Sequence, residues 1–258
     1  MTRRRLVQAV VAGVAAGLLA GVFGVGGGIL MVPALVLVLK MDQRTAHGTS
    51  LAAVIPIAAA STLSYALAGE VDWAVALILA IGSTVGAVIG TQLLRVVPQR
   101  KLAFLFAMIL LATAVRFVVA EGHGTSSGGH SFATQVGLVG AGLGAGILAG
   151  LLGVGGGSVL VPVMVVGAGM ATVLAKGTSL AVIILTALVG TWRNRSNKNV
   201  DLGVAAIAGL SGVASGFLGG VLSVAMPERL ADLLFAALLV IVATKMLWDL
   251  RRKPAQHD

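Results

Sequence analysis

Two glycine runs are the residues of this chain best suited to chemistry. The run 24–28, Gly-Val-Gly-Gly-Gly, returns unchanged at 153–157, which is 129 residues later, and a proline follows each run at Pro33 and Pro162. Consecutive glycines disfavour a regular helix, so each run is expected to break one helix and begin another. A helix N-terminus offers unpaired N–H groups and the positive end of a dipole, which suit an anion. The candidate anion-binding residues are Gly26, Gly27, Gly28, Gly155, Gly156 and Gly157. Close helix packing alone is the alternative reading.

A second repeated motif follows each glycine run and supplies hydroxyl groups. Gly-Thr-Ser occurs at 48–50 and again at 177–179. Threonine and serine can cap the helices they begin, and their hydroxyls can also donate hydrogen bonds to an oxyanion. The candidate hydroxyls belong to Thr49, Ser50, Thr178 and Ser179.

The residue before the Gly-Thr-Ser motif differs between the two copies, His47 in the first and Lys176 in the second. A cation within a membrane needs a partner or a function, and an anionic substrate would partner Lys176. Histidine has an unperturbed pKa of about 6.5, so His47 could carry a coupled proton. The alternative is that both residues lie in exposed loops at the membrane surface.

The elements that must position these motifs are membrane-spanning helices. The chain has 258 residues, of which 58% are hydrophobic and only 10% charged, and its mean hydropathy is +1.03. A soluble protein needs far more polar surface. Several apolar runs reach the ~20 residues that cross a bilayer as a helix, and their continuity excludes a β-barrel. The composition predicts an all-α polytopic membrane protein.

The whole chain is a duplication. Residues 17–36 return at 146–165 with twelve of twenty positions identical. We expect a first transmembrane repeat at 1–121, a polar linker at 122–131 and a second repeat at 132–258. The apolar segments of the first repeat fall at 6–23, 28–39, 46–68, 73–94 and 102–119. Their counterparts fall at 135–152, 157–169, 175–192, 202–223 and 231–249. Segments 28–39 and 157–169 are too short to cross and are expected to be glycine-broken half-helices.

Loop charges predict the orientation of the two repeats. Basic residues mark the N-terminus, the connection at 95–101, the connection at 193–198 and the C-terminus as cytoplasmic. The connection at 70–72 and the linker have no lysine or arginine and are expected outside. Equivalent connections therefore fall on opposite sides, which predicts two inverted repeats of about five membrane segments each, with both termini cytoplasmic. Eight spans with parallel repeats are the alternative.

Several function classes are excluded or disfavoured by the residues present. The net charge of +9 comes from basic residues at segment ends, which are topology signals and not a nucleic-acid surface. The chain has no cysteine, and its four histidines have no metal-ligand spacing. It also lacks a P-loop and a pair of carboxylates placed for acid–base chemistry. We expect no enzyme, no metal and no cofactor.

The motifs resemble those of the TauE/SafE family of sulfite exporter-like membrane proteins. The resemblance rests on the glycine-broken first helix with Val-Pro (17–36), Ala-x-Gly-Thr-Ser-Leu (46–51) and Gly-x-Val-Asp-Trp (69–73), and on their repetition. It covers nearly the whole chain and implies a secondary transporter of sulfite, sulfoacetate or similar anions in the bacterial cytoplasmic membrane. The lack of cysteine argues against the thiol mechanism of thiosulfate uptake proteins, and Trp73 becomes Leu202 in the second repeat.

The resulting hypothesis is a secondary transporter that exports a small sulfur-containing or organic anion by rocking one repeat against the other. The anion would lie between the two glycine runs, with the four hydroxyls around it and charge from Lys176 and His47. A passive anion channel, a permease for non-sulfur carboxylates and a membrane scaffold are the alternatives. The expected partners are the small anion and the lipid bilayer, with no nucleic acid, and the small-residue faces leave a homodimer open.

Overall fold

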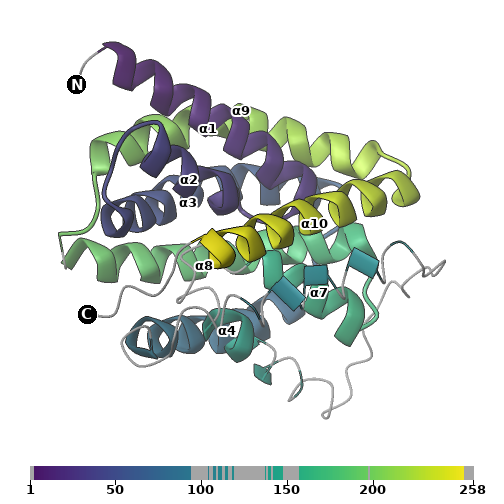
Figure 1. Cartoon of the computed structure of the whole chain (residues 1–258). Coiled ribbons are helices and arrows are strands. Elements are labelled where there is room, and N and C mark those ends of the chain that lie inside the picture. The colour runs from purple at the N-terminus through teal and green to yellow at the C-terminus, as the bar shows by residue number, and fades with distance from the viewer. Residues whose placement is uncertain are drawn as a thin grey trace.

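The chain is helical throughout the part that the structure describes. The computed structural model describes residues 3–93, 157–196 and 198–252, together with scattered positions between 104 and 147. No strand occurs among these residues, which confirms the all-α class. The labelled helices are α1 (Arg3–Phe23), α2 (Gly28–Leu37), α3 (Gln43–Leu67), α4 (Trp73–Leu93), α7 (Gly157–Gly167), α8 (Thr172–Ser196), α9 (Leu202–Ala225) and α10 (Glu228–Arg252) (Figure 1).

Four of the described helices are long and apolar enough to cross a membrane, as the composition predicts. They comprise Arg3–Phe23, Arg44–Leu67, Thr172–Ser196 and Leu202–Ala225. Gly28–Leu37 and Trp73–Ile89 are shorter apolar helices. The chain is therefore a multi-pass helical membrane protein. The predicted linker at 122–131, and with it the division of the chain at 121 and 132, lies outside the described residues.

Aspartate side chains set the point at which three helices begin. The Asp42 carboxylate accepts hydrogen bonds from the N–H groups two and three residues later, at 2.9 and 3.2 Å, and so caps α3. Asp72 and Asp201 each accept one bond of 3.0 Å from the N–H three residues later. These two positions are equivalent in the duplicated sequence, so α4 and α9 begin in the same way.

Helices α1 and α9 lie side by side and run in the same direction (Figure 1). A Cβ added at Gly13 would collide with the Ala208 carbonyl, and one added at Gly17 with the Gly212 carbonyl. The Ser215 hydroxyl donates across the same interface to the Val14 carbonyl at 2.9 Å. Small residues thus bring the two backbones into contact, which is how helices associate where apolar burial gives little drive.

Residues 142–146 of the second half pack on α4 of the first half in the same way. A Cβ added at Gly142 would lie 2.8 Å from the Leu79 carbonyl oxygen of α4, and one at Gly146 would collide with the Ser83 carbonyl. Each of these glycines and carbonyls is 129 residues from its counterpart at the α1–α9 interface. The two halves therefore pack against each other through exchanged, equivalent contacts.

Helices α3 and α8 are equivalent in sequence and run antiparallel. A Cβ added at Gly48, near the start of α3, would collide with the Asn199 carbonyl just after α8. A Cβ added at Gly177, near the start of α8, would collide with the Glu70 carbonyl just after α3. The two contacts exchange under the 129-residue offset, so the start of each helix packs on the segment that follows the end of the other.

The first glycine run ends α1 and turns the chain back along it. Gly24, Gly26 and Gly27 have φ of +69°, +75° and +70°, a left-handed conformation that residues with a Cβ rarely adopt. A Cβ added at Gly27 would lie 2.6 Å from the carbonyl oxygen of Ala16, in the middle of α1. The ten-residue α2 begins at Gly28 and packs against the α1 face that contains Ala16.

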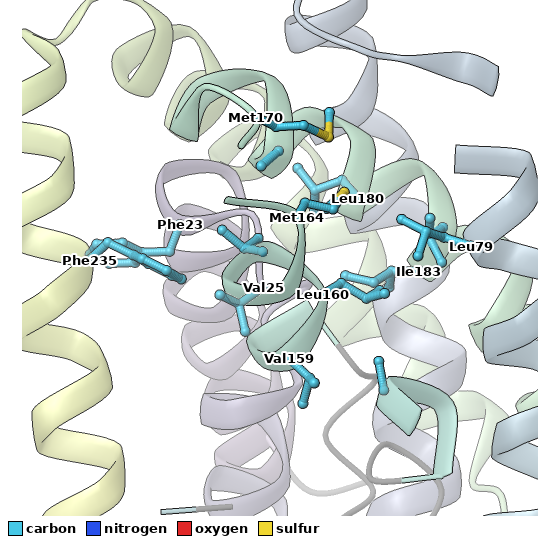
Figure 2. Close-up of a cluster of buried hydrophobic side chains, with 14 of the residues drawn as sticks. Phe23, Val25, Leu79, Val159, Leu160, Met164, Met170, Leu180, Ile183 and Phe235 are labelled. Carbon is cyan, nitrogen blue, oxygen red and sulfur yellow. The ribbon is translucent and has the colours of Figure 1, made fainter. Parts of the chain in front are cut away.

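A single apolar cluster joins residues of both halves (Figure 2). Val25, from the break after α1, packs there with Ile183 of α8 and with Leu160 and Met164 of α7. Leu160 and Met164 are fully buried, so α7 is enclosed by protein on the face that bears them. The cluster surrounds the region in which the candidate site lies.

Candidate functional site

The two glycine runs meet at the middle of the α3–α8 pair. A Cβ added at Gly26 would lie 3.0 Å from Ile183 Cδ1 and 3.5 Å from Val54 Cγ1. A Cβ added at Gly157 would lie 2.6 Å from the same Ile183 Cδ1 and 2.8 Å from the Val25 Cα. Val54 and Ile183 are equivalent positions, each one residue from the middle of a 25-residue helix. Gly155 and Gly156 lie outside the described residues.

The N-terminus of α2 at this meeting point leaves backbone donors unused. The Leu30 and Met31 N–H groups both donate to the Gly27 carbonyl, at 3.1 and 2.9 Å. Within the described part of the chain, the N–H groups of Gly26, Gly27 and Gly28 have no hydrogen-bond acceptor. No side chain caps the helix either. Unpaired N–H groups at the positive end of a helix dipole can bind an anion.

Lys176 is fully buried in the first turns of α8, next to the first glycine run. A Cβ added at Gly24 would lie 2.6 Å from both the Cα and the Cβ of Lys176, so the lysine stem lies directly against that glycine. The structure therefore places Lys176 inside the helix bundle and not in an exposed loop. Sequence reasoning found the residue and left its location open.

The Lys176 ammonium extends towards α9 and α10. Its Nζ donates to the Ser223 hydroxyl at 3.3 Å and lies 5.9 Å from the centre of the Phe235 ring. Phe235 also packs on Phe23, with ring centres 6.2 Å apart (Figure 2). Asp232 of α10 attracts Lys176 electrostatically, and one of its carboxylate oxygens is buried. None of these neighbours carries a repeated motif, which is why sequence reasoning missed them.

The two serines of the Gly-Thr-Ser motifs face the meeting point of the glycine runs. Ser50 and Ser179 are buried and each lies four residues before Val54 or Ile183, which puts it one turn away on the same helix face. The Ser179 hydroxyl has no hydrogen-bond partner among the residues that the structure describes. Because Lys176 lies three residues before Ser179, one stripe of α8 carries an ammonium, an unpaired hydroxyl and the Ile183 contact with both glycine runs.

The two threonines bind backbone groups of the opposite half. Thr49 Oγ1 accepts a hydrogen bond of 2.9 Å from the Asp201 N–H, and Thr178 Oγ1 accepts one of 3.0 Å from the Asp72 N–H. The two bonds exchange under the 129-residue offset, and they lie at opposite ends of the antiparallel α3–α8 pair. Each threonine is fully buried and retains its own hydroxyl proton for donation.

His47 occupies in α3 the position that Lys176 occupies in α8. It is partly buried, and its Nδ1 atom is shielded from solvent. Among the residues that the structure describes, no group of three or more histidine, aspartate or glutamate side chains is placed to hold a metal ion. The described site is therefore built from backbone N–H groups, hydroxyls and one buried lysine.

Comparisons with known proteins match nearly the whole chain. The family model described as "Sulfite exporter TauE/SafE" matches residues 1–117 and 138–258. A probable membrane transporter protein of Xylella fastidiosa is 28% identical over 255 residues, covering 96% of this chain and 97% of the relative. The probable membrane transporter protein YunE of Bacillus subtilis is 25% identical over 265 residues, covering 93% and 96%. A probable membrane transporter protein of Methanocaldococcus jannaschii is 27% identical over 187 residues, covering 70% and 69%.

Proposed function

Because this chain belongs to the sulfite exporter TauE/SafE family of membrane transporters, we propose that it moves a small sulfur-containing or organic oxyanion across the bacterial cytoplasmic membrane. Sulfite, sulfoacetate or a similar sulfonate is the proposed cargo, and export is the proposed direction. The observation that carries the proposal is the α8 stripe of Lys176, Ser179 and Ile183, which faces both glycine runs where they meet.

The proposed site binds the oxyanion by hydrogen bonds and one charge. The N–H groups of Gly26–Gly28 and the Ser179 hydroxyl bind its oxygens, and Lys176 supplies the positive charge. Gly157, the described residue of the second glycine run, approaches from the other half. Ser50 occupies the position equivalent to Ser179. Donors held in a buried, preorganised frame discriminate by the number and spacing of acceptor oxygens, which suits a sulfite or sulfonate group.

We further propose that the two halves are inverted repeats of five membrane segments with both termini cytoplasmic. The antiparallel packing of α3 and α8 supports this, since equivalent spans that run in opposite directions require an axis in the membrane plane. The middle of the pair then lies near the bilayer midplane, and α2 and α7 start there as half-helices. Irregular backbone at that depth is tolerated because protein encloses it.

Two equivalent threonine bonds between the halves support a proposal of alternating access. Thr49 holds the Asp201 N–H at one end of the α3–α8 pair, and Thr178 holds the Asp72 N–H at the other. In an inverted arrangement these ends face opposite sides of the membrane. We propose that one of these hydrogen bonds breaks while the other remains formed. We also propose that His47, in the half opposite Lys176, carries the coupled proton.

Reporter fusions test the orientation of the repeats. Fusions after Glu70 and after residue 197 should report opposite sides of the membrane, with the first outside and the second in the cytoplasm. Fusions to the two termini should both report the cytoplasm. If positions 70 and 197 report the same side, the repeats are parallel and the proposed two-gate cycle is wrong.

Ligand stabilisation and flux test the cargo. Purified protein is heated with sulfite, sulfoacetate, taurine, sulfate, acetate or phosphate, and sulfite or sulfoacetate should raise the melting temperature most. Saturating flux in proteoliposomes identifies a transporter, whereas flux that never saturates and follows voltage alone identifies a channel. Stabilisation by acetate alone indicates a carboxylate permease, and no stabilisation by any anion removes the anion-site proposal.

A further inference from the structure

The Lys176 ammonium has more hydrogen-bond donors than acceptors in this structure. An ammonium carries three N–H donors. Within the described part of the chain, its one hydrogen bond, at 3.3 Å, goes to the neutral Ser223 hydroxyl, and the Phe235 ring lies 5.9 Å away. Neither neighbour carries a full negative charge. A buried cation within a membrane protein is costly unless an anion neutralises it.

Asp232 is placed to provide that negative charge. It lies three residues before Phe235 on α10, so both side chains are on one face of the helix, and Phe235 is the residue that packs on the Lys176 ammonium. One Asp232 carboxylate oxygen is fully shielded from solvent. A buried carboxylate in this position acts on Lys176 through a low-dielectric interior, where charges interact strongly.

The duplicated sequence gives independent support for pairing the two residues. The position equivalent to Lys176 is His47, and the position equivalent to Asp232 is Ala103. The aromatic residue that contacts the ammonium is unchanged, since Phe235 corresponds to Phe106. The half with the lysine is thus the half with the carboxylate, and the first half has histidine and alanine at the two equivalent positions.

We propose that Asp232 is the internal counter-ion of Lys176 and that the transported anion competes with it for the lysine. This inference rests on the proposed function. In the empty protein the carboxylate neutralises the ammonium, and the incoming oxyanion takes its place. When the anion leaves, Asp232 returns to the ammonium and favours release. The exchange keeps a negative charge near Lys176 at every stage and prevents the cargo from being held too tightly.

Anion binding to the Asp232→Asn variant tests the competition. Sulfite binding is measured by isothermal titration calorimetry on purified full-length protein. Loss of the competing carboxylate should lower the Kd about tenfold, corresponding to a competition of about 1.4 kcal/mol. The control variant, Glu228→Gln, removes a negative charge one turn earlier on α10 and should leave the Kd within about twofold. An unchanged or higher Kd in Asp232→Asn overturns the proposal.

A double-variant cycle tests the pair without any ligand. Unfolding is measured for Lys176→Met, Asp232→Asn and the double variant, which removes both charges. If the residues neutralise each other, each single change should lower the melting temperature and the double variant should recover part of the loss. Additive losses overturn the pairing. If Asp232→Asn is too unstable to purify, recovery of folded protein in the double variant provides the same test.

The two experiments separate failure of this inference from failure of the proposed function. If Lys176→Met leaves sulfite binding intact, Lys176 is not in the anion site, and the proposed function lacks a residue that supplies the positive charge. If Lys176→Met abolishes binding while Asp232→Asn does not tighten it, the anion site stands and the counter-ion exchange is wrong.

Discussion

Replacing Gly24 by alanine tests whether the first glycine run is packed directly on the Lys176 stem. Gly24 has a φ of +69°, and an alanine residue in this left-handed region costs about 1–2 kcal/mol. The added Cβ would also lie 2.6 Å from the Cα and Cβ of Lys176. These atoms belong to a buried helix and cannot swing aside, so overpacking adds about 1–3 kcal/mol. We expect Gly24→Ala to lower the free energy of unfolding by about 2–5 kcal/mol.

Gly69→Ala is the matched control for backbone strain. Gly69 has a φ of +77° and no heavy atom within 4 Å of an added Cβ, so only the left-handed conformation is penalised, at about 1–2 kcal/mol. Both variants are unfolded by titration with sodium dodecyl sulfate, and their free energies of unfolding are compared. The difference between them, at least about 1 kcal/mol, measures the Lys176 contact. Equal losses in the two variants would refute this packing of Gly24 on Lys176.

Four further changes probe the hydroxyls and the helix cap. Thr49→Val and Thr178→Val each remove one inter-repeat hydrogen bond, worth about 1 kcal/mol, and should expose opposite ends of the α3–α8 pair to thiol reagents. Single cysteines introduced there report cleanly because the chain has none. Ser179→Ala removes an unpaired buried hydroxyl, so stability should be unchanged or higher while sulfite binding weakens several-fold; weaker stability with unchanged binding would contradict the site. Asp42→Ala removes the α3 cap. Hydrogen bonds from the Thr45 side chain and from the backbone lower the pKa of the Asp42 carboxyl below its usual 3.8. The cap therefore stabilises the fold above pH 3.8, and the difference between variant and wild type in a pH-dependent unfolding series should vanish as the pH falls through the lowered value.

The helices could be predicted from the sequence because few backbone conformations are stable within a lipid bilayer. Every buried N–H and C=O must be satisfied within the segment, so apolar length and glycine runs locate helices and breaks. The predicted segments 28–39 and 73–94 became α2 (Gly28–Leu37) and α4 (Trp73–Leu93). The small deviations lie at helix ends, where capping decides the boundary. The anion site between the two glycine runs stays a prediction; among the described residues, Gly157 lies against Val25.

The directions of the side chains could not be predicted in the same way. Thr178 and Ser179 are neighbours in the motif, yet one hydroxyl binds the Asp72 N–H and the other faces the glycine runs. This division depends on helix rotation, which is set by long-range packing and not by local sequence. The neighbours of Lys176 on α9 and α10 lie about 50 residues away in sequence, and they became visible only when the packing was known.

The backbone and hydroxyl contacts between the two halves are symmetric, whereas the charged residues are not. The glycine–carbonyl contacts and the threonine bonds occur in equivalent pairs, which supports the proposed rocking of one half against the other. The cation does not occur twice, since the first half has His47 where the second has Lys176, and Ala103 where the second has Asp232. In the proposed cycle, a frame with two equivalent faces and a single lysine would alternate between the two sides of the membrane and neutralise one anion. We therefore expect one anion bound per chain, and a calorimetric stoichiometry of two would require His47 to bind a second.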